Sequence, residues 1–227
     1  MRSAAIWILL FLGLSAGAFL MTSYHLELYQ KLLLVIALAV GFNFLFGIAG
    51  QIAFSHIVFY GIGAYSVVSL TFKLGLPLIV GIVGGAAVCA LLALIVAIPS
   101  TRLEGFYLAL ATLAFAQLVL VVLGEGGSLT GGAQGLSSFK LPTLFGLELT
   151  GVAYTPIIVA VLLLNFAIIL RLDRSHFGRA CRAVRDNPTA AEAMGVDVVR
   201  TKVVVFTLTS TLAGLVGMAY AFVNNYL

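Results

Sequence analysis

Charge is the scarcest feature of this sequence. Asp, Glu, Lys and Arg make up only 9% of its 227 residues, whereas soluble domains usually carry about 25%. Apolar residues make up 62% of the chain. This balance excludes an ordinary soluble domain, because the few polar residues could not cover so large an apolar content in water. The composition favours a membrane protein.

Cysteine and histidine are also few. Cys89 and Cys181 lie in an apolar run and in a basic segment, so we expect them at different depths, where they cannot form a disulfide. His25, His56 and His176 are dispersed without neighbouring carboxylates or cysteines. The sequence therefore predicts neither a disulfide framework nor a metal or catalytic centre built on histidine.

The residues that bind and hydrolyse nucleotides are missing as well. No lysine follows a glycine, so the Gly-Lys-Ser/Thr core of a phosphate-binding loop is absent. Paired carboxylates for acid–base chemistry are not found either, since Glu104 and Glu125 stand at opposite ends of one apolar run. The sequence does not indicate a membrane enzyme, and any ATP hydrolysis must occur on another chain.

Long apolar runs, by contrast, are abundant. Seven of them cover residues 4–21, 32–48, 57–70, 77–99, 105–123, 151–170 and 203–223. Because about 20 apolar residues cross the hydrocarbon core as a helix, the sequence predicts an all-α fold, a polytopic transmembrane helical bundle of about seven spans. The first run follows Arg2 and also fits a secretory signal peptide, but its length favours a retained span.

Small residues recur within these runs at helical spacing. Gly13 and Gly17 are four residues apart, as are Gly81 and Gly85. Residues at this spacing share one helix face, and small residues there permit close contact between helices. We therefore expect both pairs at helix contacts.

A short polar interruption separates the second apolar run from the third. It contains Gly47, Gly50, Gln51 and Ser55 and is too short for a folded loop, so it predicts a tight turn or a broken helix. Non-helical backbone at membrane depth is tolerated only where protein covers it or where it lines a wet cavity.

Polar groups within apolar spans are candidates for a substrate path, because they usually face the interior of a bundle. The candidates are Gly50, Gln51, Ser55, His56, Thr112 and Gln117. Hydrogen bonding between helices is an equally weighted alternative for the side chains, and close helix packing is an alternative for the glycine.

Basic residues are concentrated in one insert, residues 171–202. Seven of the chain's twelve lie there: Arg171, Arg174, Arg179, Arg182, Arg185, Arg200 and Lys202. If the insert is cytoplasmic, nine basic residues lie on that side and three outside, the latter being Lys31, Lys73 and Lys140. The positive-inside rule therefore predicts a cytoplasmic insert and a cytoplasmic N-terminus.

The second half of the insert predicts a short capped helix. Asn187 is a good N-cap and Pro188 suits the first helical position. Residues 189–194 favour helix by propensity, and Gly195 provides a left-handed stop. Two turns are far fewer than the ~12–15 residues that a helix needs to be stable alone in water, so another surface must hold this helix.

The first half of the insert predicts a basic helix. Ser175 is a candidate cap, and Arg179, Arg182 and Arg185 recur every three residues on one side. Contact with anionic lipid head groups would explain the arginines. It does not explain the short capped helix that follows, so we favour a docking surface for another protein.

No shift in composition marks a second domain, so residues 1–227 are interpreted as a single transmembrane domain. The chain ends soon after the run at 203–223. This position fits either a natural terminus or a chain cut before further spans.

Several stretches, in register, resemble the permeases of bacterial ABC importers, and more narrowly the LivM-type permease family of branched-chain amino acid importers. They are GIAGQIAFSH at 47–56, FYGIGAY at 59–65, EGFYLALATLAF at 104–115, TGGAQGL at 130–136, FGRACRAVRDN at 177–187 and AAEAMG at 190–195. Family members usually continue past this chain's last run with further spans.

In that family the last of these stretches forms a coupling helix that fits a groove on an ATPase subunit. The resemblance implies ATPase coupling for Arg179, Arg182, Ala190, Ala191, Glu192, Ala193 and Gly195. It makes residues 1–227 a single transmembrane permease domain with a cytoplasmic coupling loop at 171–202. The chain would then be a transport subunit and not an enzyme.

The resemblance also implies partners. These are a second permease subunit, two ABC ATPase subunits that bind ATP and Mg, an external solute-binding protein and the lipid of a bacterial inner membrane. No cofactor on this chain and no nucleic acid is expected.

The low density of charge along the spans favours a neutral or zwitterionic solute. The resemblance points to branched-chain or other neutral amino acids, although related permeases carry urea or amides. A rival from another class is a stand-alone channel or an ion-coupled secondary transporter that uses Glu104 or Glu125.

Overall fold

The computed structural model describes residues 2–103, 105–127, 130–132, 135–136, 143–144, 147–148 and 151–224. Its helices are α1 Arg2–Gly17, α2 Ser23–Asn43, α3 His56–Val68, α4 Leu78–Ser100, α5 Phe106–Glu125, α6 Thr155–Arg174, α7 His176–Asp186, α8 Pro188–Ala193 and α9 Val198–Asn224. Two two-residue strands, β1 Thr143–Leu144 and β2 Leu147–Glu148, pair antiparallel between α5 and α6. The described part of the chain is therefore almost entirely helical, as predicted.

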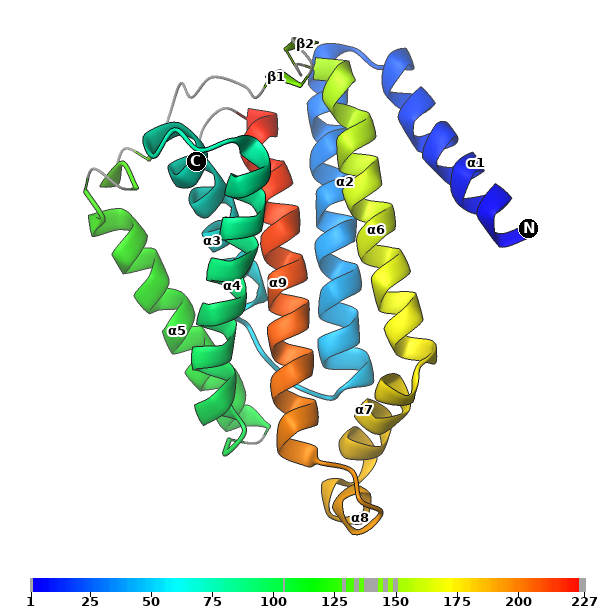
Figure 1. Ribbon diagram of the computed structural model, residues 1–227, viewed down its shortest axis with the longest axis vertical. Coiled ribbons are helices and arrows are strands. Elements are labelled where there is room, and N and C mark those ends of the chain that lie inside the picture. The colour runs from blue at the N-terminus through cyan, green and yellow to red at the C-terminus, as the bar shows by residue number, and fades with distance from the viewer. Residues whose placement is uncertain are drawn as a thin grey trace.

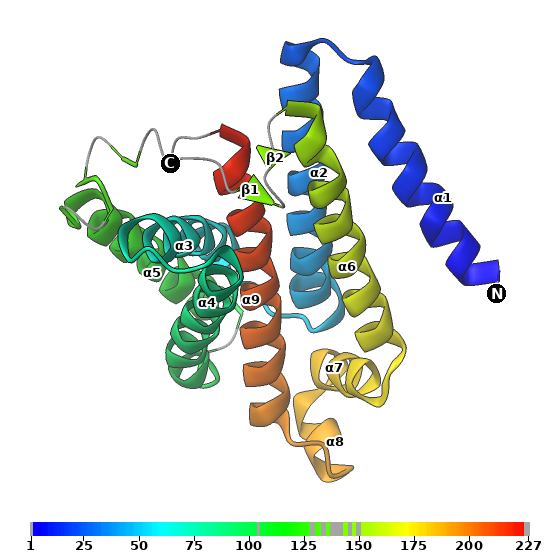
Figure 2. The same cartoon turned by 45° about the horizontal axis from the view of Figure 1, so that its top comes forward.

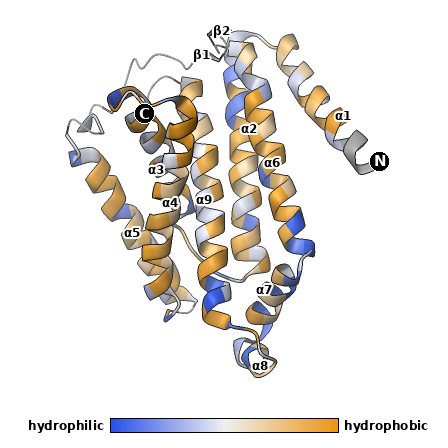
Figure 3. Ribbon diagram, viewed as in Figure 1, coloured by the Kyte–Doolittle hydropathy of each residue, from blue (hydrophilic) through white to orange (hydrophobic). Residues whose placement is uncertain are grey.

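The long helices run side by side along the longest axis of the molecule (Figure 1). α9 stands in the middle of the bundle, α1 lies at one edge and α5 at the other, and α7 and α8 lie beyond one end. Hydropathy follows this arrangement, since apolar residues line the long helices while hydrophilic residues gather at the end that carries α7 and the start of α9 (Figure 3).

Five helices in the described ranges are long and apolar enough to cross a membrane: Ser23–Ile48, Leu78–Ser100, Phe106–Glu125, Gly151–Arg174 and Val198–Val223. The prediction of about seven spans is not confirmed. The run at 4–21 gives only a short apolar helix, Trp7–Gly17, and the run at 57–70 gives the 13-residue α3. Both are shorter than the about 20 residues that a straight span requires.

The predicted helix break between the second and third runs is confirmed. α2 ends in a π-helical turn, Phe44–Ile48, and α3 does not begin until His56. Gly50 sits between them with φ +68°, a left-handed conformation that favours glycine. α3 then lies across α9 rather than alongside it (Figure 2). We call residues 47–55 the helix break.

α9 is the helix around which the bundle packs, since it contacts α2, α3, α4, α6 and α7. Phe59 of α3 and Phe206 of α9 are buried and meet edge to face, with ring centroids 6.0 Å apart. Phe115 of α5 also packs against Phe59, with a centroid distance of 5.7 Å. Such aromatic contacts add directional packing, which matters in a membrane because lipid tails are as apolar as the side chains.

Glycines allow the backbones of α3 and α9 to touch where they cross. A Cβ added to Gly63 would lie 2.1 Å from the carbonyl oxygen of Gly214. A Cβ added to Gly217 would lie 1.8 Å from the carbonyl oxygen of Tyr60. No side chain fits at either position, so the crossing depends on the absence of side chains.

The expected contact of Gly81 and Gly85 is confirmed. Both are buried, and a Cβ on Gly85 would lie 2.7 Å from Cε of Met218 in α9. The expected contact of Gly13 is wrong for the described residues, because nothing lies within 4 Å of its Cβ position. The Cβ position of Gly17 has one neighbour, the Tyr29 hydroxyl at 3.8 Å.

The crossing gives a matched pair of variants on one helix. We expect Gly63→Ala to destabilise the protein by about 1–3 kcal/mol, because the added methyl group overlaps the backbone of α9. Gly61→Ala adds the same group where nothing lies within 4 Å, so we expect stability equal to wild type or up to about 1 kcal/mol higher. Thermal unfolding of the purified protein in detergent measures both; equal midpoints would contradict the crossing.

Candidate functional site

The candidate site lies at the end of the bundle that carries α7 and α8 (Figure 1). The last turn of α6, the helix break and the start of α9 come together there with these two short helices, and α7 contacts the π-helical turn at the end of α2 as well as α9. Two separate parts of the sequence, residues 171–202 and the helix break, therefore build this site.

α7 begins at the predicted cap. The Ser175 side chain accepts hydrogen bonds from the backbone N–H groups of Phe177 and Gly178, at 3.1 and 3.3 Å. Gly178, Cys181 and Val184 recur every three residues and are buried, so this face of α7 packs inward. Burial raises the pKa of the Cys181 thiol to about 11, and the thiol is therefore neutral at physiological pH and acts as a packing group.

α8 has a predicted cap at each end, and both are confirmed. Asn187 Oδ1 accepts a hydrogen bond from the N–H of Ala190 at 3.0 Å. Gly195 has φ +84°, and its N–H donates to the carbonyl of Glu192 at 2.9 Å. The N–H of Val196 donates to the carbonyl of Ala191 at 3.0 Å. These two bonds form a Schellman motif, which stops the helix.

The predicted coupling residues of α8 divide into two groups. Ala191 is only 4% exposed and packs against the rest of the chain. Ala190, Glu192, Ala193 and Gly195 are exposed. Met194, which lies between Ala193 and Gly195, is 85% exposed, an unusual position for a large apolar side chain. α8 therefore presents a small apolar surface outward and uses one alanine to pack inward.

The two predicted coupling arginines of α7 both turn toward their own chain. Arg182 forms an ion pair with Asp173 at the end of α6, and its guanidinium also donates to the carbonyl of that residue at 3.3 Å. Arg179 is exposed, and its Nη1 donates a long hydrogen bond of 3.5 Å to the carbonyl of Arg174. These contacts hold α7 against α6, and the half-exposed ion pair contributes at most about 1 kcal/mol.

Arg185 has a contact that the sequence did not single out. Its Nη1 donates a hydrogen bond to the carbonyl oxygen of Gly47 in the helix break. Its side-chain stem covers Gly50, where an added Cβ would lie 2.6 Å from Arg185 Cγ. The three-residue spacing identified the row of arginines, but only the position of a basic residue in the last turn of a short helix sets Arg185 apart.

Gln51 connects the helix break to the start of α9. Its Nε2 donates to the carbonyl oxygen of Lys202 at 3.1 Å, and its side chain is buried. Beside this contact lies a cavity of about 150 Å³. The cavity is lined by the helix break, the ends of α4 and α5, and α7 to α9, with polar contributions from Gln51, Ser100, Thr101, Arg185 and Lys202.

The other substrate-path candidates lie in different surroundings. Thr112 is fully buried, and its hydroxyl accepts a hydrogen bond from the N–H of Phe54 in the helix break at 3.0 Å. Ser55 and His56 are buried at the start of α3, 1% and 4% exposed. Gln117 is exposed on α5, so the structure does not bring it together with Thr112. Three of the six candidates, Gly50, Gln51 and Ser55, lie in the helix break, and His56 is the first residue of α3. Thr112 of α5 is hydrogen-bonded to the break.

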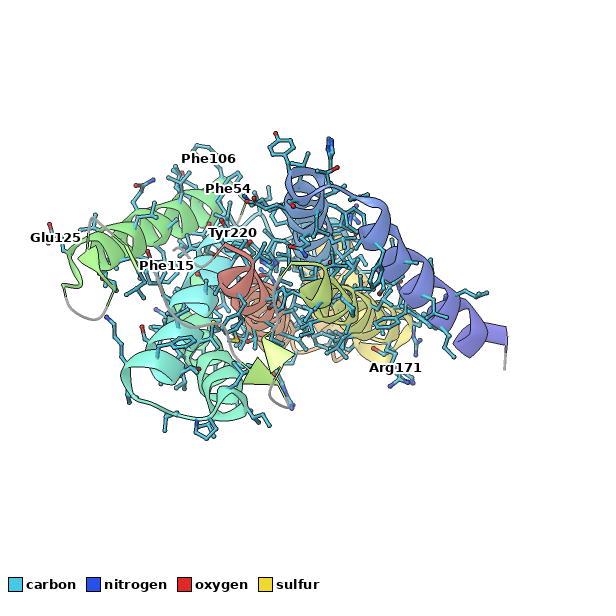
Figure 4. All side chains as sticks on the ribbon, turned by 90° about the horizontal axis from the view of Figure 1, so that it is seen from above. Phe54, Phe106, Phe115, Glu125, Arg171 and Tyr220 are labelled. Carbon is cyan, nitrogen blue, oxygen red and sulfur yellow. The ribbon has the colours of Figure 1, made fainter. Side chains whose placement is uncertain are left out.

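The carboxylates of the rival interpretation do not form a site in the described structure. Glu125 is exposed at the far end of α5, at the edge of the bundle and away from Tyr220 of the central helix (Figure 4). Glu104 lies outside the described residues. No group of three or more metal-ligating side chains gathers anywhere in the described ranges.

These features define a class of protein: a multi-pass membrane protein with a broken helix inside and a short, doubly capped helix presented at one end. The sequence comparison identifies the family. Residues 24–226 match the family described as the permease component of the branched-chain amino acid transport system. The chain belongs to this family.

Relatives agree with this assignment. The chain is 31% identical to the high-affinity branched-chain amino acid transport system permease protein LivM of Salmonella typhimurium, over 91% of this chain and 54% of the relative. The LivM protein of Escherichia coli gives the same three percentages. A probable LivH permease of Methanocaldococcus jannaschii is 28% identical over 87% of this chain and 65% of the relative. The chain spans about half the length of the two LivM relatives. No solved structure matches the chain.

The cap at Gly195 gives a test of how α8 is held. We expect Gly195→Val to speed amide hydrogen exchange at Ala190 and Val196 by about tenfold, because a β-branched residue pays about 1–2 kcal/mol in the left-handed conformation. Gly195→Asn is the matched control, since asparagine adopts that conformation at little cost. Exchange as slow in the valine variant as in wild type would show that the helix does not need this cap.

Proposed function

We propose that this chain is a permease subunit of a binding-protein-dependent ABC importer. Its membership of the permease family supports this function, as does α8. A helix of six residues has no stability of its own in water, yet α8 carries caps at both ends and exposes Met194 and two alanines. Such a preformed apolar projection suits a groove on another protein, because little conformational entropy is lost when it binds. α8 is the observation that carries the proposal.

The mechanism that follows is alternating access. Binding of ATP and Mg brings the two ATPase subunits together, and α8 moves with them. The membrane helices then open to the other side of the membrane. This chain supplies the path and the docking helix, while partner chains supply ATP hydrolysis. A second permease subunit and an external solute-binding protein complete the importer.

We place α7 and α8 in the cytoplasm of a bacterial cell, at the inner membrane. Eight of the basic residues that support this orientation lie at one end of the bundle: Arg102 after α4, and the seven in the insert. The arrangement obeys the positive-inside rule. We also propose a cytoplasmic N-terminus, because α1 runs from the N-terminus toward the end of the bundle opposite α7 and α8 (Figure 1).

The proposed solute is a branched-chain or other neutral amino acid. The names of the LivM and LivH relatives support this substrate. Gln51, Ser55 and Thr112, the buried polar side chains in and against the helix break, carry no charge, which agrees with a solute of no net charge. Urea and amides are the alternative solutes and belong in the same test.

Uptake by the complete importer in vesicles tests this function. We expect accumulation of labelled leucine to require ATP, and to fall to background when both ATPase subunits carry inactivated nucleotide sites. Omitting the solute-binding protein is the control for the route of entry, and urea in place of leucine tests the substrate. Undiminished uptake with the inactive ATPases would overturn the proposal in favour of a stand-alone channel or secondary transporter.

Two alanines of α8 separate docking from folding. We expect Ala193→Leu, on the exposed face, to reduce co-purification of the ATPase subunits by about tenfold or more, because a bulkier side chain clashes in a close-fitting groove. The amide exchange of α8 should stay unchanged. Ala191→Leu changes a residue that is 4% exposed, so its exchange should rise together with any loss of docking. If Ala193→Leu leaves docking intact, this face is not the ATPase contact.

A further inference from the structure

The segment that carries α8 is anchored at both of its ends to the same short stretch of chain. Arg185, at the end of α7, donates a hydrogen bond to the carbonyl of Gly47. Lys202, in α9, accepts a hydrogen bond on its carbonyl from Gln51 at 3.1 Å. α8 lies between these two anchors in the sequence. Residues 47–51 of the helix break are therefore hydrogen-bonded to the chain on both sides of α8, before it at Arg185 and after it at Lys202.

The first anchor takes the place of a missing helical partner. The carbonyl groups in the last turn of a helix have no N–H partner further along the chain, and Gly47 lies in the π-helical turn that ends α2. A cation at such a helix end forms a charge-assisted hydrogen bond and also interacts favourably with the helix dipole. The Arg185 guanidinium supplies a donor for the Gly47 carbonyl and a positive charge at the negative end of the helix dipole.

The fit between the arginine stem and the backbone leaves no space. Gly50 has φ +68°, and an added Cβ would lie 2.6 Å from Cγ and 3.1 Å from Cβ of Arg185. The stem of Arg185 therefore rests directly on the backbone of the break. A displacement of the end of α7 therefore presses on this backbone through the first carbon atoms of the Arg185 side chain, which are the least flexible part of it.

The break is joined on its other side to the helices of the bundle. The N–H of Phe54 donates to Thr112 Oγ1 of α5 at 3.0 Å. Two residues further on, α3 begins, and its backbone meets that of α9 at Gly63 and Gly214. Movement of the break therefore reaches α3 through the covalent chain and α5 through a hydrogen bond.

We propose that Arg185 and Gln51 form the link that transmits a displacement of α8 to the helix break and so to α3 inside the membrane. The inference rests on the proposed function, in which ATPase subunits move α8. Arg185 is a positioning residue in this scheme, because it acts on the break and not on the solute. Gly50 and Gln51, which the sequence suggested for a substrate path, then belong to the transmission of movement.

The test compares uptake with ATP hydrolysis in the complete importer. Arg185→Met keeps the apolar stem over Gly50 and removes the guanidinium. Arg171→Met is the matched control, since it removes the same charge from the same insert; Arg171 is exposed at the edge of the bundle and points away from it (Figure 4). Three quantities are measured for each variant: co-purification of the ATPase subunits, basal ATP hydrolysis, and leucine uptake per ATP hydrolysed.

We expect Arg185→Met to retain ATPase co-purification and basal hydrolysis within about twofold, and to lower uptake per ATP about tenfold or more. That factor is what the loss of one hydrogen bond from a charged donor commonly produces in an equilibrium. Arg185→Lys, which restores a positive charge and a donor, should recover part of the ratio. Arg171→Met should match wild type in all three measurements.

Other outcomes overturn the link. An unchanged ratio in Arg185→Met shows that the contact does not transmit movement. Equal losses of docking, hydrolysis and thermal stability show that Arg185 only supports the fold. If Arg185→Met cannot be purified, Gln51→Leu tests the second anchor by the same ratio, and a wild-type value there rejects the link. Wild-type uptake that persists with inactive ATPases rejects the proposed function itself, a result separate from these.

Discussion

Backbone hydrogen bonding at the helix break is the constraint on which the rest of this structure depends. A chain inside a membrane cannot leave N–H and C=O groups without partners, because no water is available to replace them. The break interrupts the helical pattern, and two of its backbone groups bond to distant parts of the chain. The carbonyl of Gly47 is paired by Arg185 and the N–H of Phe54 by Thr112. The positions of α5 and α7 beside the break meet this requirement for these two groups.

The polar end of the molecule is built from short helices that depend on caps and on packing. α7 has 11 residues and α8 has six, too few for either to persist alone. Each is held by a side-chain cap at its start, Ser175 and Asn187, and by packing against the bundle through Cys181 and Ala191. The result is a small, well-ordered surface, which agrees with the docking of ATPase subunits proposed above.

The sequence predicted the features whose causes are local. The caps of α8 depend on Asn187 and Gly195 and on residues within a few positions, so the spacing alone was sufficient. The break was predicted because glycines and polar residues interrupt an apolar run. The family resemblance rested on the same local stretches and is confirmed by the match over residues 24–226.

Features that depend on tertiary contacts were beyond the sequence. An apolar run does not reveal whether its helix crosses the membrane or lies across a neighbour, so residues 57–70 were counted as a span. Arg179, Arg182 and Arg185 have identical spacing, and only the fold assigns them to three different partners. The inward face of α8, with Ala191, is likewise defined by what packs against it.

The crossing of α3 and α9 limits how the interior can rearrange. At Gly63 and Gly214 the two backbones touch with no side chain between them, and Gly217 meets the carbonyl of Tyr60 in the same way. Sliding one helix along the other would drive backbone atoms into each other, since no rotamer change can relieve the overlap. The two contacts lie one helical turn apart and together lock the position of α3 along α9. A rearrangement of the interior therefore has to carry these two helices as one body.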